Sequence, residues 1–191
     1  MGSPERLDDV LLELGQFFNG ELATTQLAIG ALRTVAHQMV VTFESSDDTA
    51  ETRLLGPGVP DSGWVGVFTG LLGAQQFQAD VAEGGHVHQR LTQQWVVTVY
   101  TAWEEDFRGR VAAARGASKN DVASEFFGDL RRLRHDIVHH RGVASADHSA
   151  RCGTTAVVQR KLAAGDPIYI SDEELTWMHF RMPWSELEGR A

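Results

Sequence analysis

The chain has 191 residues, of which 42% are hydrophobic and 23% are charged, and its formal net charge is −9. This composition is typical of one soluble domain with its own core, and it excludes a disordered tail, a collagen and a disulfide scaffold. A single cysteine, Cys152, makes neither an internal disulfide nor a four-cysteine zinc site. The chain has no run of about 18 apolar residues, and its start, MGSPERLDDV, lacks the features of a secretory signal. We therefore expect a cytoplasmic protein without a membrane span.

The first 43 residues have the apolar periodicity of a helix. Apolar residues recur there every three, four or seven positions: Leu7, Leu11, Leu14, Phe18, Leu22, Ile29 and Ala36. Because glycine costs about 1 kcal/mol relative to alanine inside a helix, Gly15 and Gly20 predict a kink or break near Asn19–Gly20. The polar stretch Glu44–Gly63 is rich in glycine and proline, which predicts an unusually long loop.

Two helices are predicted in the middle of the chain. The first is short, covers about 65–81 and is loosened by glycines. The second is a central helix over 86–114, whose large aromatic residues, among them Trp95 and Trp103, we interpret as core. Gly116 predicts the end of this central helix.

The next helix is predicted between Ser118 and Gly142. Ser118 or Asn120 would cap its start, and Gly142 would end it in a left-handed conformation. Gly128 predicts a division into a short piece and a second helix capped by Asp129. Its apolar positions are assigned to the core or to an interface: Val122, Phe126, Leu130, Leu133, Ile137 and Val138.

Beyond Ala144 the helical periodicity ends. Two β-like stretches, 154–159 and 168–171, flank the turn sequence AAGDP and predict a small hairpin. Ser171–Glu174 has the pattern of a capping box that opens a short helix, which Pro183 ends. We predict a mainly α fold: an up-and-down bundle of four to five helices over residues 1–145, followed by a small mixed extension over 146–191.

Charge is distributed unevenly along the chain. The stretch Arg108–Arg151 carries nine Lys/Arg against five Asp/Glu, whereas the rest is strongly acidic. Four of the eight histidines lie in the same stretch: His135, His139, His140 and His148. This segregation favours a patch that faces an anion on an otherwise acidic surface.

The densest run of reactive side chains is Leu130–Gly142, LRRLRHDIVHHRG. Within it, RHDIVH from Arg134 to His139 resembles the R-x4-H signature of HEPN domains, in which a polar residue follows the arginine. The apolar pair Ile137–Val138 and the following glycine are also similar to that segment of the family. The resemblance is close over Leu130–Gly142, extends to the preceding helices only as architecture, and does not cover the tail.

Many HEPN domains are metal-independent endoribonucleases that act as dimers, with the motifs of the two subunits meeting at the interface. The resemblance therefore implies that His139 is the catalytic histidine and Arg134 the catalytic arginine. It also implies an RNA substrate, no metal or cofactor, a homodimer, and a role as a toxin or defence effector, for which an antitoxin or regulatory protein would be a further partner.

The chemistry of these side chains agrees with that function. Cleavage of RNA by its own 2′-hydroxyl needs a base and an acid, and histidine serves in either role near neutral pH. An arginine fork offers aligned donors to the phosphate oxygens that gain charge. The products would be a 2′,3′-cyclic phosphate and a 5′-hydroxyl.

One geometric conflict accompanies this assignment. Five residues of helix turn through about 500°, which leaves Arg134 and His139 about 140° apart on one ideal helix. Either two chains assemble one site, or Arg134 lies at an irregular helix start. We favour the dimer, because it also supplies two histidines, one for each proton transfer.

Residues around the motif are candidates for substrate contact: Arg131, His135, Asp136, His140 and Arg141. Residues four apart share a helix face, so Asp136 could orient the imidazole of His140.

Two alternative functions stay open. In the first, the chain is a non-catalytic HEPN module for dimerisation or RNA binding. In the second, His135 and His139 hold a metal ion together with His37, His86 or His88, in an arrangement that loosely resembles DinB-like helical bundles.

Overall fold

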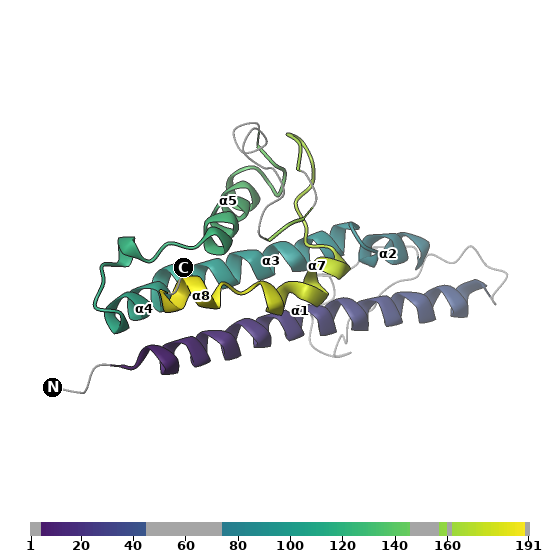
Figure 1. The fold of residues 1–191 in the computed structure, drawn as a ribbon. Helices are drawn as coiled ribbons and strands as arrows, with labels where there is room; N and C mark the ends of the chain where they lie inside the picture. Colours follow the sequence, from purple (N-terminus) through teal and green to yellow (C-terminus); the bar gives the residue numbers. More distant parts are fainter. Residues whose placement is uncertain (1–4, 45–73, 146–156, 160–161, 190–191) are drawn as a thin grey trace, which may run out of the picture.

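The computed structural model describes residues 5–44, 74–145, 157–159 and 162–189. Most of the predicted loop before the second helix and the surroundings of Cys152 lie outside these ranges. Within them the chain is mainly helical and contains no strand, which confirms the predicted fold class (Figure 1). No helix in the described ranges combines the length and hydropathy needed to cross a bilayer.

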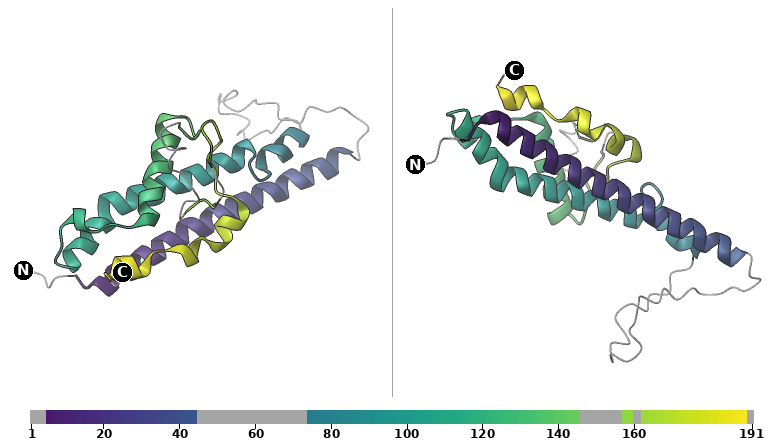
Figure 2. Two further views of the ribbon diagram at one scale, coloured as in Figure 1. Left: turned by 45° about the horizontal axis from the view of Figure 1, so that its top comes forward. Right: turned by 90° about the horizontal axis from the view of Figure 1, so that it is seen from below.

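Two long antiparallel helical rods form the body of the molecule (Figures 1 and 2). The first is α1 (Leu7–Glu44), a single helix of 38 residues. After α2 (Ala74–Val81), the second rod consists of α3 (His86–Ala102), the π-helical turn η1 (Trp103–Phe107) and α4 (Arg108–Ala114). Helix α1 packs against α2, α3 and α4. The predicted central helix is thus confirmed, with one π-helical turn inside it.

The predicted break near Asn19–Gly20 is wrong, because α1 continues through both glycines. Phe18 and Leu22, on either side of Gly20, are buried in the core. Their burial outweighs the roughly 1 kcal/mol that glycine costs in a helix. Gly15 has a further role: a Cβ there would lie 3.1 Å from the Trp184 ring, so its absence lets the C-terminal tail approach α1.

Helix α5 (Glu125–His139) carries the motif and packs across α3 (Figures 1 and 2). Ser124 caps it, whereas Ser118 caps a separate 3-10 turn, η2 (Lys119–Asp121). The predicted division at Gly128 is wrong, since Gly128 lies inside one continuous helix. Asp129 does not cap a helix either.

The inner face of α5 is fixed by aromatic and aliphatic contacts. Phe127 stacks on Trp103 with ring centroids 3.9 Å apart, and Phe126 meets Phe18 of α1 edge-on. Leu130 and Leu133 continue this buried face towards the motif. These contacts determine which way the remaining side chains of α5 point.

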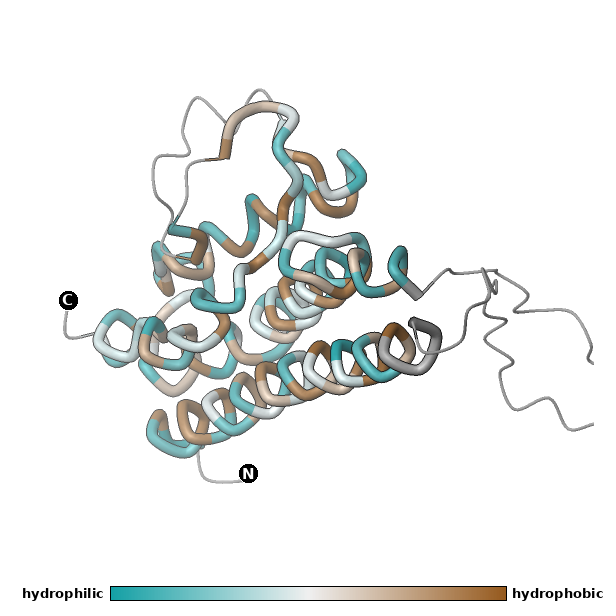
Figure 3. The backbone as a smooth tube through the Cα atoms, turned by 90° about the vertical axis from the view of Figure 1, so that its right-hand side faces the viewer, coloured by the Kyte–Doolittle hydropathy of each residue, from teal (hydrophilic) through white to brown (hydrophobic). Residues whose placement is uncertain are grey.

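The C-terminal tail contains α7 (Asp172–Trp177), the 3-10 turn η3 (Met178–Arg181) and α8 (Trp184–Glu188). The predicted capping box at the start of α7 is confirmed, with both of its reciprocal hydrogen bonds present. Figure 3 shows hydrophobic residues recurring along the helices. Tail residues share the main core with the long helices: Ile168, Ile170, Leu175, Met178 and Leu187.

The predicted hairpin is absent from the described part of the tail, where residues 168–171 form no strand. A single antiparallel bridge joins Val143 to Pro167. The backbone N–H of Ile168 donates to the carbonyl of Gly142 at 2.8 Å, and its carbonyl accepts from the side chain of Gln93 at 2.8 Å. This segment is extended because it binds the end of α5 and α3. The first half of the predicted hairpin, at 154–156, lies outside the described residues.

Candidate functional site

The motif residues occupy the last turns of α5 and its C-terminal cap. Arg134 lies well inside the helix, which begins at Glu125, so an irregular helix start at Arg134 is excluded. The Arg134 side chain is partly buried, and its Nε atom is buried without a hydrogen-bond partner among the described residues. His139 is the last helical residue and is exposed.

Within one chain, His139 lies beside His135 and not beside Arg134. The ring centroids of His135 and His139 are 4.7 Å apart, as expected one helical turn apart. The regular helix keeps Arg134 about 140° away from His139 around its axis. Of the two arrangements considered from the sequence, only the one with two chains is compatible with α5.

The exposed face of α5 combines cationic and imidazole side chains. Arg131, His135 and His139 follow one another at four-residue spacing, and all three are exposed. Arg131 also lines a hollow of about 190 Å³ beside Gly128. Val138 is not part of the core, because 48% of its surface is exposed. An exposed row of this kind can contact a polyanion along several phosphates.

Asp136 and His140 form the other edge of the motif. Asp136 is buried, with 2% of its surface exposed, so it lies beneath the surface on which a substrate would bind. Its Oδ2 accepts a hydrogen bond from the backbone N–H of Ser145 at 3.0 Å, and its Oδ1 lies 3.9 Å from His140 Nε2. The two side chains share a helix face, as the spacing predicted, but 3.9 Å is too long for a hydrogen bond that would orient the His140 ring.

Two consecutive residues with positive φ end the helix. Arg141 has φ 58° and is exposed, and Gly142 has φ 77°. Gly142 has the predicted left-handed conformation, but the helix ends earlier than expected, with His140 as its C-cap and Arg141 in the left-handed position directly after it. A Cβ at this position would displace the side-chain amide of Gln93, and the positive φ independently favours glycine.

The metal ligands predicted from spacing are not brought together. Among the described residues, the cluster whose His, Cys, Asp or Glu ligand atoms converge is His135, Asp136 and His140, without His139. His88 is unsuited to binding an ion, because both of its ring nitrogens are in hydrogen bonds. Its Nδ1 accepts from the Gly84 N–H at 3.2 Å, and its Nε2 lies 3.2 Å from Asp172 Oδ1.

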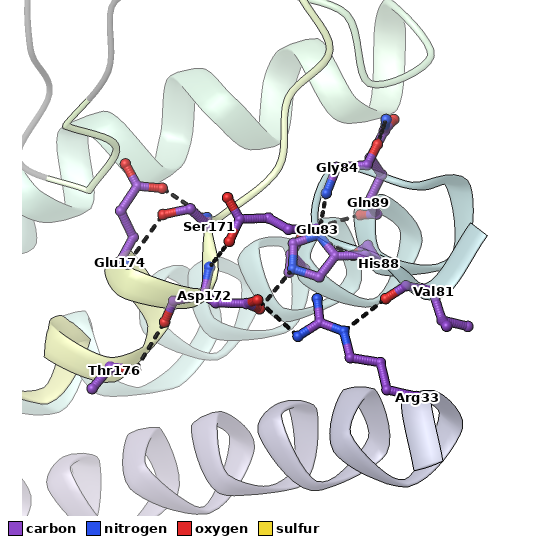
Figure 4. Close-up of polar contacts among 11 residues, drawn as sticks. Arg33, Val81, Glu83, Gly84, His88, Gln89, Ser171, Asp172, Glu174 and Thr176 are labelled. Atoms are coloured by element: carbon purple, nitrogen blue, oxygen red, sulfur yellow. Dashed lines mark hydrogen bonds and ion pairs between the residues drawn. The ribbon is translucent and has the colours of Figure 1, made fainter. Parts of the chain in front are cut away.

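Sequence reasoning missed a polar network around His88, which Figure 4 shows. The His88 side chain is fully buried on α3 and contacts Asp172, the first residue of α7. Asp172 also accepts a hydrogen bond from Arg33 Nη1 of α1 at 2.7 Å, and Arg33 Nε donates to the Val81 carbonyl at 2.8 Å. The backbone N–H of Asp172 donates to Glu83. The network thus joins α1, α2, α3 and the tail.

Protonation in this network follows from its hydrogen bonds. Because Nδ1 of His88 accepts the Gly84 N–H, the ring hydrogen is on Nε2 and points to Asp172. Burial lowers the pKa of His88 and outweighs the attraction of Asp172 for the cation. Burial pulls the pKa of Asp172 upwards, but the hydrogen bond and charge of Arg33 outweigh it, so this pKa is also lowered. With neither ring nitrogen available for proton transfer, we assign the network to fastening the tail.

Comparison with known proteins adds no relative to this picture. No protein-family model, no curated protein and no solved structure matches the chain. The functional assignment therefore rests on the motif and on the geometry of α5.

Proposed function

We propose that the protein is a metal-independent endoribonuclease of the HEPN type that acts as a homodimer. The observation that carries this proposal is the outer face of α5. This face exposes His139 beside His135 and in line with Arg131. Arg134 lies on the same regular helix, about 140° from His139 around its axis. A base, an acid and a phosphate-binding guanidinium are what cleavage by the 2′-hydroxyl requires.

In the proposed reaction, the imidazole of one His139 removes the proton from the 2′-hydroxyl, whose oxygen attacks the adjacent phosphorus. The second copy of His139 donates a proton to the 5′-oxygen as the P–O bond breaks. Arg134 donates hydrogen bonds to the phosphate oxygens that gain charge. The products are a 2′,3′-cyclic phosphate and a 5′-hydroxyl. The exposed Arg131 and Arg141 would hold the RNA backbone.

A dimer contact through Val138 would complete such a site. On the perimeter of an ideal helix, Val138 lies between the two catalytic positions, about 40° from Arg134 and about 100° from His139. It is apolar and 48% exposed. A second α5 seated over Val138 would therefore have Arg134 on one side and His139 on the other.

The test is cleavage of total RNA or tRNA by the purified protein in the presence of EDTA. We expect His139→Ala and Arg134→Ala to lose at least about 100-fold in rate, which is the usual contribution of acid–base or charge-stabilising groups. His179→Ala, which removes an exposed histidine from η3, serves as the matched control and should cut like the unmodified protein.

Because Arg134 is partly buried, circular dichroism must accompany this assay, and Arg134→Lys provides a milder second variant. Full activity in both the His139 and the Arg134 variants would refute the assignment. A dimer that binds RNA without cutting it would instead be the non-catalytic module considered above.

The proposal includes a biological role as a toxin or defence effector. Its expected consequence is growth arrest on expression in a bacterial host, relieved by His139→Ala at equal protein level. Equal growth arrest by the unmodified protein and by His139→Ala would show that toxicity does not depend on RNA cleavage, and would contradict this role.

A further inference from the structure

We propose that the C-terminal end of α5 binds a divalent transition-metal ion of the Zn²⁺ class through His135, Asp136 and His140. The ligand atoms of these three side chains all lie within 4.8 Å of one another. Two imidazoles and one carboxylate form a donor set that suits zinc and its first-row neighbours. Neither proposed catalytic residue belongs to this set, so the proposal does not depend on the nuclease activity.

The end of α5 is shaped so that His140 turns back towards Asp136. The backbone N–H groups of His140 and Gly142 both donate to the carbonyl of Asp136, at 2.8 and 3.3 Å. The positive φ angles of Arg141 and Gly142 then reverse the chain immediately after His140. His140 is consequently held over the last turn of the helix, where its ring lies 5.7 Å from that of His135.

Asp136 is oriented as a ligand by the chain that follows. The backbone N–H of Ser145 donates to Asp136 Oδ2 at 3.0 Å, which leaves Oδ1 on the side of His140 Nε2, 3.9 Å away. The N–H of the preceding residue, Ala144, donates to the Asp166 carbonyl at 2.9 Å. This hydrogen bond to the tail fixes the backbone next to Ser145. In known metal sites, hydrogen bonds from groups that do not contact the metal fix the orientation of the ligands.

The three ligands need only a small movement to close on an ion. Zinc–ligand distances of 2.0–2.2 Å place neighbouring ligand atoms about 3.4 Å apart in a tetrahedron. The present separations of up to 4.8 Å would have to close by rotation of the His135 and His140 side chains, both of which are exposed. Asp136, which is buried, would stay in place. The fourth position would be taken by water.

The experiment uses full-length protein without a histidine tag, treated with EDTA, desalted, and titrated with ZnCl₂ in competition with a chromophoric chelator. We expect one ion per chain and a rise in the thermal midpoint, because the ion binds the folded state. His135→Ala and His140→Ala should each weaken zinc binding by at least about tenfold. Cobalt(II) in place of zinc provides a visible d–d spectrum that both variants should lose.

His179→Ala is the matched control, since it removes an exposed histidine remote from α5 in sequence and should keep the affinity of the unmodified protein. Asp136→Asn tests the carboxylate while keeping an acceptor for the Ser145 N–H; it should weaken zinc binding in folded protein. Less than one tightly bound ion per chain, or unchanged affinity in both histidine variants, would overturn the site. RNA cleavage does not enter this measurement, so it distinguishes the failure of this proposal from that of the nuclease.

Discussion

Replacing Asp172 with alanine should lower the free energy of unfolding by about 2 kcal/mol. The substitution removes two interactions that fasten the tail to the long helices: the 3.2 Å hydrogen bond from His88 and the 2.7 Å ion pair with Arg33. No apolar side chain is lost, so the effect measures the polar network itself.

The magnitude follows from the different exposure of the two partners. The His88 side chain is fully buried, so its ring N–H would lose its acceptor without access to water, at a cost of about 1–3 kcal/mol. The side chains of Arg33 and Asp172 are 32% and 43% exposed, so solvent screens their ion pair, which contributes at most about 1 kcal/mol. Most of the expected loss therefore comes from the histidine.

Urea denaturation followed by circular dichroism measures this change. Glu173→Ala is the matched control, because it removes the neighbouring, exposed carboxylate from the same helix and should alter stability by less than about 0.5 kcal/mol. Asp172→Asn should fall between them, since an amide oxygen can still accept from His88. Equal stabilities of the Asp172→Ala and Glu173→Ala proteins would refute the reasoning.

Three further results are expected. Burial lowers the pKa of His88, so on acidification the unfolded chain binds a proton at this ring before the folded chain does. The free energy of unfolding should therefore be highest above the unfolded pKa of about 6.5 and decrease below it. Thermal melts at a series of pH values measure this dependence, which His88→Gln should weaken. Val138→Glu should convert the proposed dimer to a monomer in analytical ultracentrifugation and lower RNA cleavage at least about tenfold, with an unchanged circular dichroism spectrum; a persistent dimer contradicts the interface. Gly142→Ala should lower the free energy of unfolding by about 1–3 kcal/mol in urea denaturation, because the residue has a positive φ and its Cβ would displace the Gln93 side chain. Gly109→Ala, at a helical position with open space around it, should instead raise the free energy of unfolding by about 0.5–1 kcal/mol.

The helices could be predicted from the sequence because apolar periodicity reports a buried face directly. It located α1 and the central rod, whose inward residues such as Trp95 and Val99 are buried. The helix break predicted at Gly20 is wrong, because the cost of about 1 kcal/mol for glycine in a helix is outweighed by the burial of the neighbouring apolar residues. Local propensity is therefore a weaker guide than the pattern of the whole helix.

The hairpin failed for a different reason. Residues 168–171 have the apolar, β-branched character of a strand, and Ile168 and Ile170 are indeed fully buried. The backbone of Ile168, however, bonds to the Gly142 carbonyl and to the side chain of Gln93, which are distant in sequence and are not on a neighbouring strand. Composition predicts that such a segment is extended and buried, but it does not identify its hydrogen-bond partners.

At the candidate site, helix geometry alone predicted that Arg134 and His139 point in different directions, and the regular course of α5 agrees. The burial of Asp136 could not be predicted, because it depends on how α5 packs across α3. The contact between His88 and Asp172 joins residues 84 positions apart, and no local pattern connects them. Sequence spacing also does not distinguish a buried, hydrogen-bonded histidine such as His88 from a metal ligand.

The motif on α5 faces three environments at once, and this constrains what one subunit can do. Asp136 points inwards, Arg134 lies at the boundary, and His135 and His139 face solvent. Rotating α5 to expose Arg134 fully would move Leu133 and Leu130 out of the core, at a cost of about 1.5–3 kcal/mol for each leucine side chain. A rearrangement within one chain is therefore a poor route to the proposed catalytic pair, whereas a second α5 would supply the missing group without disturbing the core. The dimer is consequently the step on which the nuclease proposal depends most.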